Sequence, residues 1–224
     1  MFKGKTVSVI VPCLNEEEAI GKVLDAVPPY VDEVIVVDNN SSDRTAEIAR
    51  AHGAKVVGED IRGYGRAYKR GFALATGDVI VTLDGDHSYP IDAVSYLLDA
   101  YDHLGVQFVS ASRLSVMNGE AMDFKHYIGN RALSLLTSVL FLRWVQDSQS
   151  GMWVFARKAL EKMKLESDGM AFSEEIKVEA ITNREIGFCE LPILYSSRIG
   201  RKKLRPWRDG WGNLVMLLKK RFLR

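Results

Sequence analysis

Apolar runs rich in valine and isoleucine recur along the first eighty residues, and polar loops separate them from amphipathic segments. The apolar runs predict buried strands over residues 6–12, 31–37, 54–57 and 79–83. The intervening segments predict helices over residues 16–27, from 42 or 43 to 52, and after 63–66 to 75. This alternation predicts an α/β fold with a doubly wound, mainly parallel sheet and helices on both faces.

The second half of the chain continues the pattern less regularly. It predicts strands over residues 108–112, 152–155 and 188–195, and helices over 92–103, 125–145 and from 173 onward. Pro192 cannot donate a backbone hydrogen bond, so we expect the last strand at a sheet edge or with broken pairing. The 125–145 segment has an apolar middle, which fits a core helix or one partly buried in a membrane interface or against a lipid chain.

The end of the chain combines a basic stretch with an amphipathic pattern. Residues 198–224 contain ten Lys and Arg and one Asp, although the whole chain has a net charge of only +1. Apolar residues recur at helical spacing over 207–224: Trp211, Leu214, Val215, Leu218 and Phe222. This helix fits an anchor at a phosphate-bearing lipid surface, or a solvated helix packed on the domain. We therefore expect a catalytic domain over 1–197 and a basic amphipathic tail over 198–224.

The composition is that of an ordinary globular protein, with 47% hydrophobic and 26% charged residues among 224. Cys13 and Cys189 are too few and too far apart for a disulfide framework, so we expect buried, reduced thiols and a cytosolic compartment. No signal peptide is expected, because the apolar segment 7–14 is short and runs into acidic residues. The longest uncharged apolar run, 132–142, is shorter than the roughly 20 residues that span a bilayer.

Two carboxylates separated by a glycine, Asp84-Gly85-Asp86, follow the fourth predicted strand. Taken alone, such a sequence is also an ordinary turn. Hard divalent cations prefer oxygen ligands, and Mg²⁺ commonly takes one or two carboxylates together with phosphate oxygens. At the carboxyl end of a buried strand, this pair therefore suits a site for a metal ion and a diphosphate.

Polar residues follow the other predicted strands as well, and the carboxyl ends of parallel strands share one edge of the sheet. Four segments should meet in that crevice: Asn15-Glu16, Asp38-Asn39 with the loop through Asn40, the stretch 63–66 with Gly65 and Arg66, and Asp84–Asp86. This convergence predicts a nucleotide site. Neither a Rossmann glycine fingerprint nor a P-loop is present in the sequence, which argues against dehydrogenases and ATPases.

Five motifs, in their order and spacing, resemble the family-2 glycosyltransferases, which have the Rossmann-like GT-A fold. The motifs are residues 9–16, 36–45, 84–86, 147–151 and 198–202. The last two are similar to those of dolichyl- and polyprenyl-phosphate sugar synthases, and the resemblance covers nearly the whole chain. It implies inverting transfer of a sugar from a UDP- or GDP-sugar to dolichyl or polyprenyl phosphate. It also implies Mg²⁺ or Mn²⁺ as cofactor.

The resemblance assigns roles to particular residues. The nucleotide sugar would contact Pro12, Asn15, Glu16, Asp38, Asn40, Gly65, Arg66 and Asp84. The metal would bind Asp86 and Ser88, and the lipid phosphate would face Arg113, Arg131, Arg198 and Lys202. Asp84, Asp86, Arg113 and Arg131 would form the catalytic set. We expect a cytoplasmic enzyme that lies peripherally on the inner face of the membrane and has no nucleic-acid partner.

The chain departs from the family pattern at three positions. Ser88 stands where the mannose synthases typically have a glutamine, and its hydroxyl can still bind a cation. Tyr127 stands where an arginine is frequent, with Arg131 close enough to replace it, and Arg201 replaces a serine. The Gln-x-x-Arg-Trp motif of processive polysaccharide synthases is missing from the sequence, which favours a single transfer over chain elongation.

Other functions fit parts of the same sequence. A soluble or glycan hydroxyl acceptor would need a general base, for which Glu174 or Glu175 is the candidate. A nucleotidyltransferase or sugar-nucleotide-binding protein of related topology would normally open with a glycine-rich signature where this chain has Pro12–Glu16. A non-enzymatic membrane- or nucleic-acid-binding module built on the basic tail is less consistent with the acidic crevice.

Overall fold

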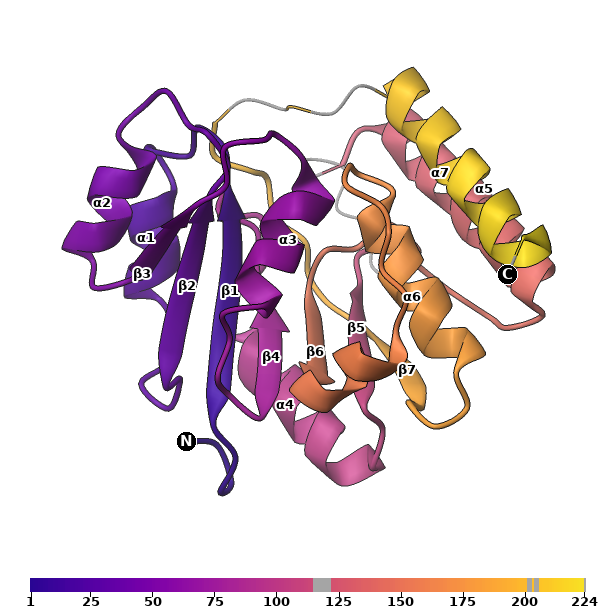
Figure 1. The fold of residues 1–224 in the computed structure, drawn as a ribbon, viewed down its shortest axis with the longest axis horizontal. Helices are drawn as coiled ribbons and strands as arrows, with labels where there is room; N and C mark the ends of the chain where they lie inside the picture. The colour runs from indigo at the N-terminus through magenta and orange to yellow at the C-terminus, as the bar shows by residue number, and fades with distance from the viewer. Residues whose placement is uncertain (115–121, 201–202, 204–205, 224) are drawn as a thin grey trace.

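The computed structural model describes residues 1–114, 122–200, 203 and 206–223, and its centre is a seven-stranded sheet (Figure 1). The strands are β1 (Val7–Cys13), β2 (Glu33–Asp38), β3 (Lys55–Gly58), β4 (Val79–Thr82), β5 (Phe108–Ser112), β6 (Trp153–Ala156) and β7 (Phe188–Pro192). They lie in the order β3-β2-β1-β4-β6-β5-β7. Only β6 is antiparallel to its neighbours in this sheet, so the predicted mainly parallel α/β fold is confirmed.

Helices cover both faces of the sheet. They are α1 (Ile20–Asp25), α2 (Thr45–Ala51), α3 (Tyr64–Phe72), α4 (Ala93–Leu104), α5 (Phe124–Phe141), α6 (Phe172–Thr182) and α7 (Pro206–Phe222), with a 3₁₀ helix at Arg157–Lys162. Helices α1, α2 and α4 share one apolar core with the sheet, and α3 and α6 share the other. Alternate side chains of β1 point to opposite faces, so Val9 belongs to the first core and Ile10 to the second.

Helix α7 packs on the domain beside α5, at the side of the molecule away from β3 (Figure 1). Met216 and Leu217 are buried against α5 and α6. Lys220 is buried too, and its ammonium group lies 2.9 Å from Glu175 and 2.8 Å from Glu179. The opposite face of α7 leaves large aromatic side chains in solvent. In the described part of the chain, no helix has the length and hydrophobicity needed to cross a bilayer.

The predicted limits of two helices were wrong because loop contacts replace helical ones. Helix α1 begins at Ile20 instead of residue 16. Asn15 has a left-handed backbone (φ 53°) and accepts a hydrogen bond from the Ser42 amide at 2.7 Å, which ties it to the loop after β2. Helix α5 ends at Phe141 because Leu142 is also left-handed (φ 53°), so residues 142–145 are not helical.

The last strand and the cysteines agree with the sequence in most respects. Strand β7 pairs with β5 alone among the described strands and ends at Pro192, so it is the edge strand that the proline predicted. Neither cysteine forms a disulfide. Cys13 is buried in the core, but Cys189 is only half-buried because it lies on this edge strand.

Candidate active site

Acidic side chains gather at the carboxyl ends of β1 and β4, where basic residues from the end of the chain meet them. Asp86 is 4% exposed and Glu16 is 7% exposed. The Arg198 guanidinium lies 2.7 Å from Asp86 and 3.7 Å from Glu16, and Lys203 forms an ion pair with Glu16. Arg198 was predicted to face a lipid phosphate, but here its charge neutralises the predicted metal ligand. Lys203 belongs to the same basic run and was not singled out.

Asp84 lies partly buried beside Asp86, and the two carboxylates repel each other although Arg113 and Arg198 offset part of their charge. The residue between the two acids, Gly85, must be small because a Cβ there would lie 2.5 Å from the Cys13 sulfur. Asp84 accepts a hydrogen bond from the Tyr64 hydroxyl at 3.3 Å. Burial and then the charge of Asp86 raise the pKa of Asp84 to about 7. Because Asp84 and Asp86 repel each other, this carboxylate pair is a suitable place for an additional cation.

The donor atoms around Asp86 fit a hard divalent cation. The Ser88 amide and hydroxyl donate to Asp86 Oδ1 at 3.0 and 2.5 Å, which fixes the orientation of the carboxylate. No group of three or more His, Cys, Asp and Glu side chains forms a metal site among the described residues. Mg²⁺ needs no such group, because one or two carboxylates suffice when phosphate oxygens and water complete its shell. Asp84 and Asp86 therefore suit a metal ion that binds together with a diphosphate.

The predicted nucleoside contacts lie around the ends of β1 and β2. Cys13 and Asp38 are paired in the β1–β2 register, which places Asp38 at the same sheet edge as Pro12 and Asn15. Asp38 Oδ1 is buried and has no hydrogen-bond partner within the described residues, so it remains available as an acceptor. The Asn40 side chain donates to the Asp60 carbonyl at 3.2 Å, which holds the neighbouring loop. Binding of the nucleoside by these residues stays a prediction.

Other predicted contacts are engaged elsewhere or lie outside the described residues. A Cβ at Gly65 would lie 2.3 Å from the Ser167 carbonyl, so glycine is needed here for packing against that loop. Arg66 forms an ion pair with Asp168 at 2.7 Å instead of pointing at the acidic cluster. The structure does not bring Gly65 and Arg66 into contact with Asp84 or Asp86. Lys202 lies outside the described residues.

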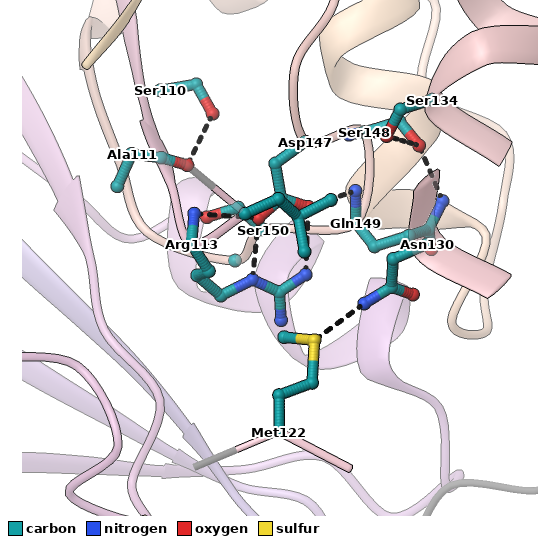
Figure 2. Close-up of polar contacts among 12 residues, drawn as sticks. Ser110, Ala111, Arg113, Met122, Asn130, Ser134, Asp147, Ser148, Gln149 and Ser150 are labelled. Carbon is teal, nitrogen blue, oxygen red and sulfur yellow. Dashed lines mark hydrogen bonds and ion pairs between the residues drawn. The ribbon is translucent and has the colours of Figure 1, made fainter. Parts of the chain in front are cut away.

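Arg113, at the end of β5, is held rigidly by Asp147 (Figure 2). Its Nε and Nη2 donate to the two oxygens of Asp147 at 2.8 and 3.0 Å, and its backbone amide donates at 2.9 Å. The guanidinium lies 5.3 Å from the centre of the Tyr195 ring. Burial alone would raise the pKa of Asp147, but Arg113 lowers it to about 2. The pair is therefore ionised at neutral pH, and the charge of Arg113 lowers the pKa of Asp84.

Arg131 links α5 to the residue that follows Arg113. Its Nη2 donates to the Leu114 carbonyl at 2.9 Å, and its Nε donates to the Tyr127 hydroxyl at 3.2 Å. The family frequently has an arginine at the position of Tyr127. In this chain Tyr127 accepts a hydrogen bond from Arg131, one helical turn later, and helps to hold it in place. The structure therefore brings the predicted catalytic residues Arg113 and Arg131 to the same end of β5.

The turn at residues 147–151 connects Arg113 with the carboxylate pair, a role that its sequence did not reveal. The Gly151 amide donates to the Tyr89 hydroxyl at 2.7 Å. A Cβ at Gly151 would lie 2.3 Å from the Tyr64 hydroxyl and 3.3 Å from Asp84. Tyr89 was missed in the sequence because tyrosines near turns are common, and Tyr64 was predicted to reach the crevice only as part of the stretch 63–66. The adjacent glycines 63 and 65 were the only local signal for Tyr64.

We expect Gly151→Ala to destabilise the protein by about 1–3 kcal/mol, because the added methyl group overpacks a buried site. It should also reduce activity by displacing Asp84. Thermal unfolding of the variant checks this, with Gly129→Ala as the control because, outside its own helix backbone, no described atom lies within 4 Å of a Cβ there. Adding Tyr64→Phe to the variant should restore part of the lost stability. Wild-type stability in Gly151→Ala would contradict this packing.

The two glutamates suggested as general bases are both in the protein interior, which argues against that role. Glu175 accepts hydrogen bonds from the amides of residues 166 and 167 and pairs with Lys220. Glu174 is fully buried and accepts from the Thr137 hydroxyl at 2.6 Å. Burial raises the pKa of Glu174 to about 7. Both carboxylates therefore serve the packing of α6 against its neighbours.

Solved structures with the same architecture include glucosyl-3-phosphoglycerate synthase from Mycobacterium tuberculosis. Its complex with Mn²⁺, UDP and phosphoglyceric acid matches with a TM-score of 0.80 and 25% sequence identity. The match covers 98% of this chain and 79% of that structure. A complex of the same enzyme with Mg²⁺ and UDP matches with a TM-score of 0.77 at 24% identity. The fold is therefore the GT-A fold.

The sequence matches the model of glycosyl transferase family 2 over residues 8–164, and the chain belongs to that family. A low-salt glycan biosynthesis hexosyltransferase (Agl6) from Haloferax volcanii is 34% identical over 220 residues, which are 95% of this chain. A dolichyl-phosphate hexose transferase from the same organism is 34% identical over 206 residues, which are 91% of this chain. The chain spans 53% of the length of the first relative and 88% of the second.

Proposed function

We propose that this protein transfers a hexose from a nucleotide diphosphate sugar to a polyprenyl or dolichyl phosphate, with inversion at the anomeric carbon. The observation that carries the proposal is the position of Arg113, a largely buried and permanently charged guanidinium held by Asp147 at 2.8 Å at the end of β5. An arginine of this kind suits a phosphate acceptor. The similarity to a dolichyl-phosphate hexose transferase supports the same acceptor. Transfer of labelled sugar to polyprenyl phosphate tests it.

The donor would bind across the ends of β1, β2 and β4. Asp38 Oδ1, which has no hydrogen-bond partner among the described residues, would accept a hydrogen bond from the nucleoside. Asp84 and Asp86 would hold Mg²⁺ or Mn²⁺ against the diphosphate. When bound, that metal supplies Lewis-acid stabilisation of charge on the nucleoside diphosphate. For the carboxylates to receive both metal and diphosphate, Arg198 must give up part of its contact with Asp86, which lies at 2.7 Å.

The acceptor side needs positioning more than it needs a base. A phosphate monoester is anionic at neutral pH, so its oxygen can attack without losing a proton to the protein. Arg113 would orient this oxygen. The Tyr195 ring beside the guanidinium limits the exposure of Arg113 to water. The burial of Glu174 and Glu175 agrees with a reaction that uses no general base.

Helices α5 and α7 supply a surface suited to a lipid acceptor in a membrane. They lie side by side and expose large apolar side chains, among them Phe124, Ile128, Leu135, Val139, Trp207, Trp211 and Phe222. Trp207 is 93% exposed, which is unfavourable for a side chain that meets only water. Lys219 and Arg221 are exposed at the end of the same helix and would meet anionic headgroups. We propose that this surface rests on the membrane during catalysis.

Replacing Trp211 and Phe222 together with serine is expected to weaken binding to anionic vesicles by about tenfold or more, because two interfacial aromatic anchors are lost. Vesicle co-sedimentation measures the effect. Leu104→Ser, at the exposed end of α4, is the control and should bind like the wild type. Unchanged binding of the double variant would contradict this membrane surface.

A small phosphorylated hydroxyl acceptor is the second candidate function. It is favoured by the similarity to glucosyl-3-phosphoglycerate synthase, whose complex contains phosphoglyceric acid. Arg113 would then hold a phosphate remote from the reacting hydroxyl. In that case transfer proceeds in solution and needs neither detergent nor a membrane.

A further inference from the structure

Lys177, in the middle of α6, is a buried lysine that the proposed reaction does not use directly. It is 0% exposed. A charged ammonium in the interior is costly unless neighbouring groups compensate for lost hydration. Its Nζ donates to the backbone carbonyl of Asp147 at 2.6 Å. Asp147 is the residue that holds Arg113, so Lys177 lies directly behind the proposed acceptor-binding arginine.

Asp147 is fixed through every polar group that it has. Its amide donates to Glu190 at 3.1 Å, while its carbonyl accepts from Lys177. Its carboxylate receives the amide and guanidinium of Arg113, as Figure 2 shows. The preceding amide, that of Gln146, donates to the other Glu190 oxygen at 2.5 Å. Glu190 on β7 and Lys177 on α6 therefore clamp this turn from two sides.

We infer that Lys177 is a positioning residue for Arg113, acting through Asp147 to hold in place the guanidinium that receives the acceptor phosphate. This inference takes the phosphate acceptor from the proposed function. The Lys177 ammonium donates to the Asp147 carbonyl and not to Asp84 or Asp86, so its effect should fall on the acceptor side of the reaction.

The charges around the turn support this role. Arg113 and Lys177 face the carboxylates of Asp147 and Glu190, and Glu174, whose pKa burial raises to about 7, also lies near Lys177. Burial lowers the pKa of Lys177 to about 8, while Asp147 and Glu190 oppose the shift. Lys177 is therefore protonated at neutral pH. Without its charge, an excess carboxylate would lie beneath Arg113 and would compete with an anionic acceptor for the guanidinium.

The first test follows Arg113 directly and needs no acceptor. The Nε–Hε NMR signal of Arg113, in protein carrying isotope-labelled arginine, is assigned by its loss in Arg113→Lys. We expect Lys177→Met to shift or broaden this signal, and Lys177→Arg to keep it closer to the wild-type position. Lys220→Met removes another buried, ion-paired lysine of the same domain and should leave the signal in place. An unmoved signal in Lys177→Met would overturn the inference.

The second test uses kinetics with a short polyprenyl phosphate. In Lys177→Met, the KM for the acceptor should rise about tenfold, the expected effect of weakening a charged hydrogen bond, while the KM for the nucleotide sugar stays within about twofold. In an Arg113→Lys background, Lys177→Met should add little, because both changes act on the same contact. Equal losses for donor and acceptor, or fully additive effects, would contradict a positioning role.

If Lys177→Met fails to fold, Lys177→Met/Glu190→Gln keeps the cluster neutral and still removes the Lys177 contact. A folded double variant should also displace the Arg113 signal, and an unchanged signal would overturn the inference. Failure of the proposed function looks different. The wild type would then make no lipid-linked product, whereas the NMR result for Lys177 would remain.

Discussion

Asp86→Asn is expected to lower sugar transfer by roughly a hundredfold to a thousandfold, because the main carboxylate for the metal–diphosphate site is lost. The substitution keeps the shape of the side chain, and its carbonyl oxygen can still accept the hydrogen bond from the Ser88 amide. Transfer rates at saturating nucleotide sugar, measured over a range of Mn²⁺ or Mg²⁺ concentrations, quantify the loss. Metal binding to the isolated protein should weaken in parallel.

Asp99→Asn is the matched control for this experiment. Asp99 lies exposed on α4 and pairs with Lys3, far from the carboxyl ends of the strands. It should retain wild-type transfer and metal dependence. The thermal unfolding of Asp86→Asn should remain close to that of the wild type, since loss of the ion pair with Arg198 is offset by loss of the repulsion between Asp84 and Asp86. Metal-dependent transfer at the wild-type level in Asp86→Asn would refute the assignment of the site.

Arg113→Lys is expected to reduce kcat/KM for the acceptor by about tenfold to a hundredfold while it changes the KM for the nucleotide sugar little. Lysine keeps the positive charge that Asp147 requires, so no buried carboxylate is left without a partner. It cannot reproduce the two parallel hydrogen bonds of Arg113, at 2.8 and 3.0 Å, and still face a phosphate. Steady-state kinetics with each substrate varied in turn separates the two effects.

Arg157→Lys provides the control for loss of a partly buried guanidinium. Arg157 donates to the Gly77 carbonyl at 2.9 Å, at the end of the sheet opposite the acidic cluster. It should leave both KM values near those of the wild type. If Arg113→Lys instead raised the KM of the nucleotide sugar and left the acceptor unaffected, Arg113 would belong to the donor site.

The sequence was sufficient to predict the mainly parallel sheet and the edge at which its acidic residues gather. Valine and isoleucine runs ending in polar residues marked β1, β2 and β4, and parallel order then required Asp38, Asp84 and Asp86 to share one edge. The amphipathic spacing also predicted α7. The sequence left open whether this helix anchors the protein at a lipid surface or packs on the domain. Lys220 is typical of a solvent-exposed position in the sequence, and only the structure shows its ion pairs with Glu175 and Glu179.

Contacts between distant segments could not be predicted from spacing. Arg198 turns back to Asp86, and Arg66 pairs with Asp168, because loops bring together residues far apart in the chain. The clamp around Asp147 is of the same kind, since Lys177 and Glu190 come from different elements. Charged residues at such positions resemble surface residues in a sequence, and only their burial reveals their role.

The proposed reaction is the transfer of a hexose to a lipid phosphate. The most direct measurement supplies labelled UDP- and GDP-hexoses with Mg²⁺ or Mn²⁺ to the protein, using a short polyprenyl phosphate in detergent or 3-phosphoglycerate in buffer as the acceptor. We expect an organic-extractable, mild-acid-labile product with the polyprenyl phosphate and with one of the donors. Label transferred only to 3-phosphoglycerate or to another soluble hydroxyl, with none in the organic phase, would contradict the lipid acceptor.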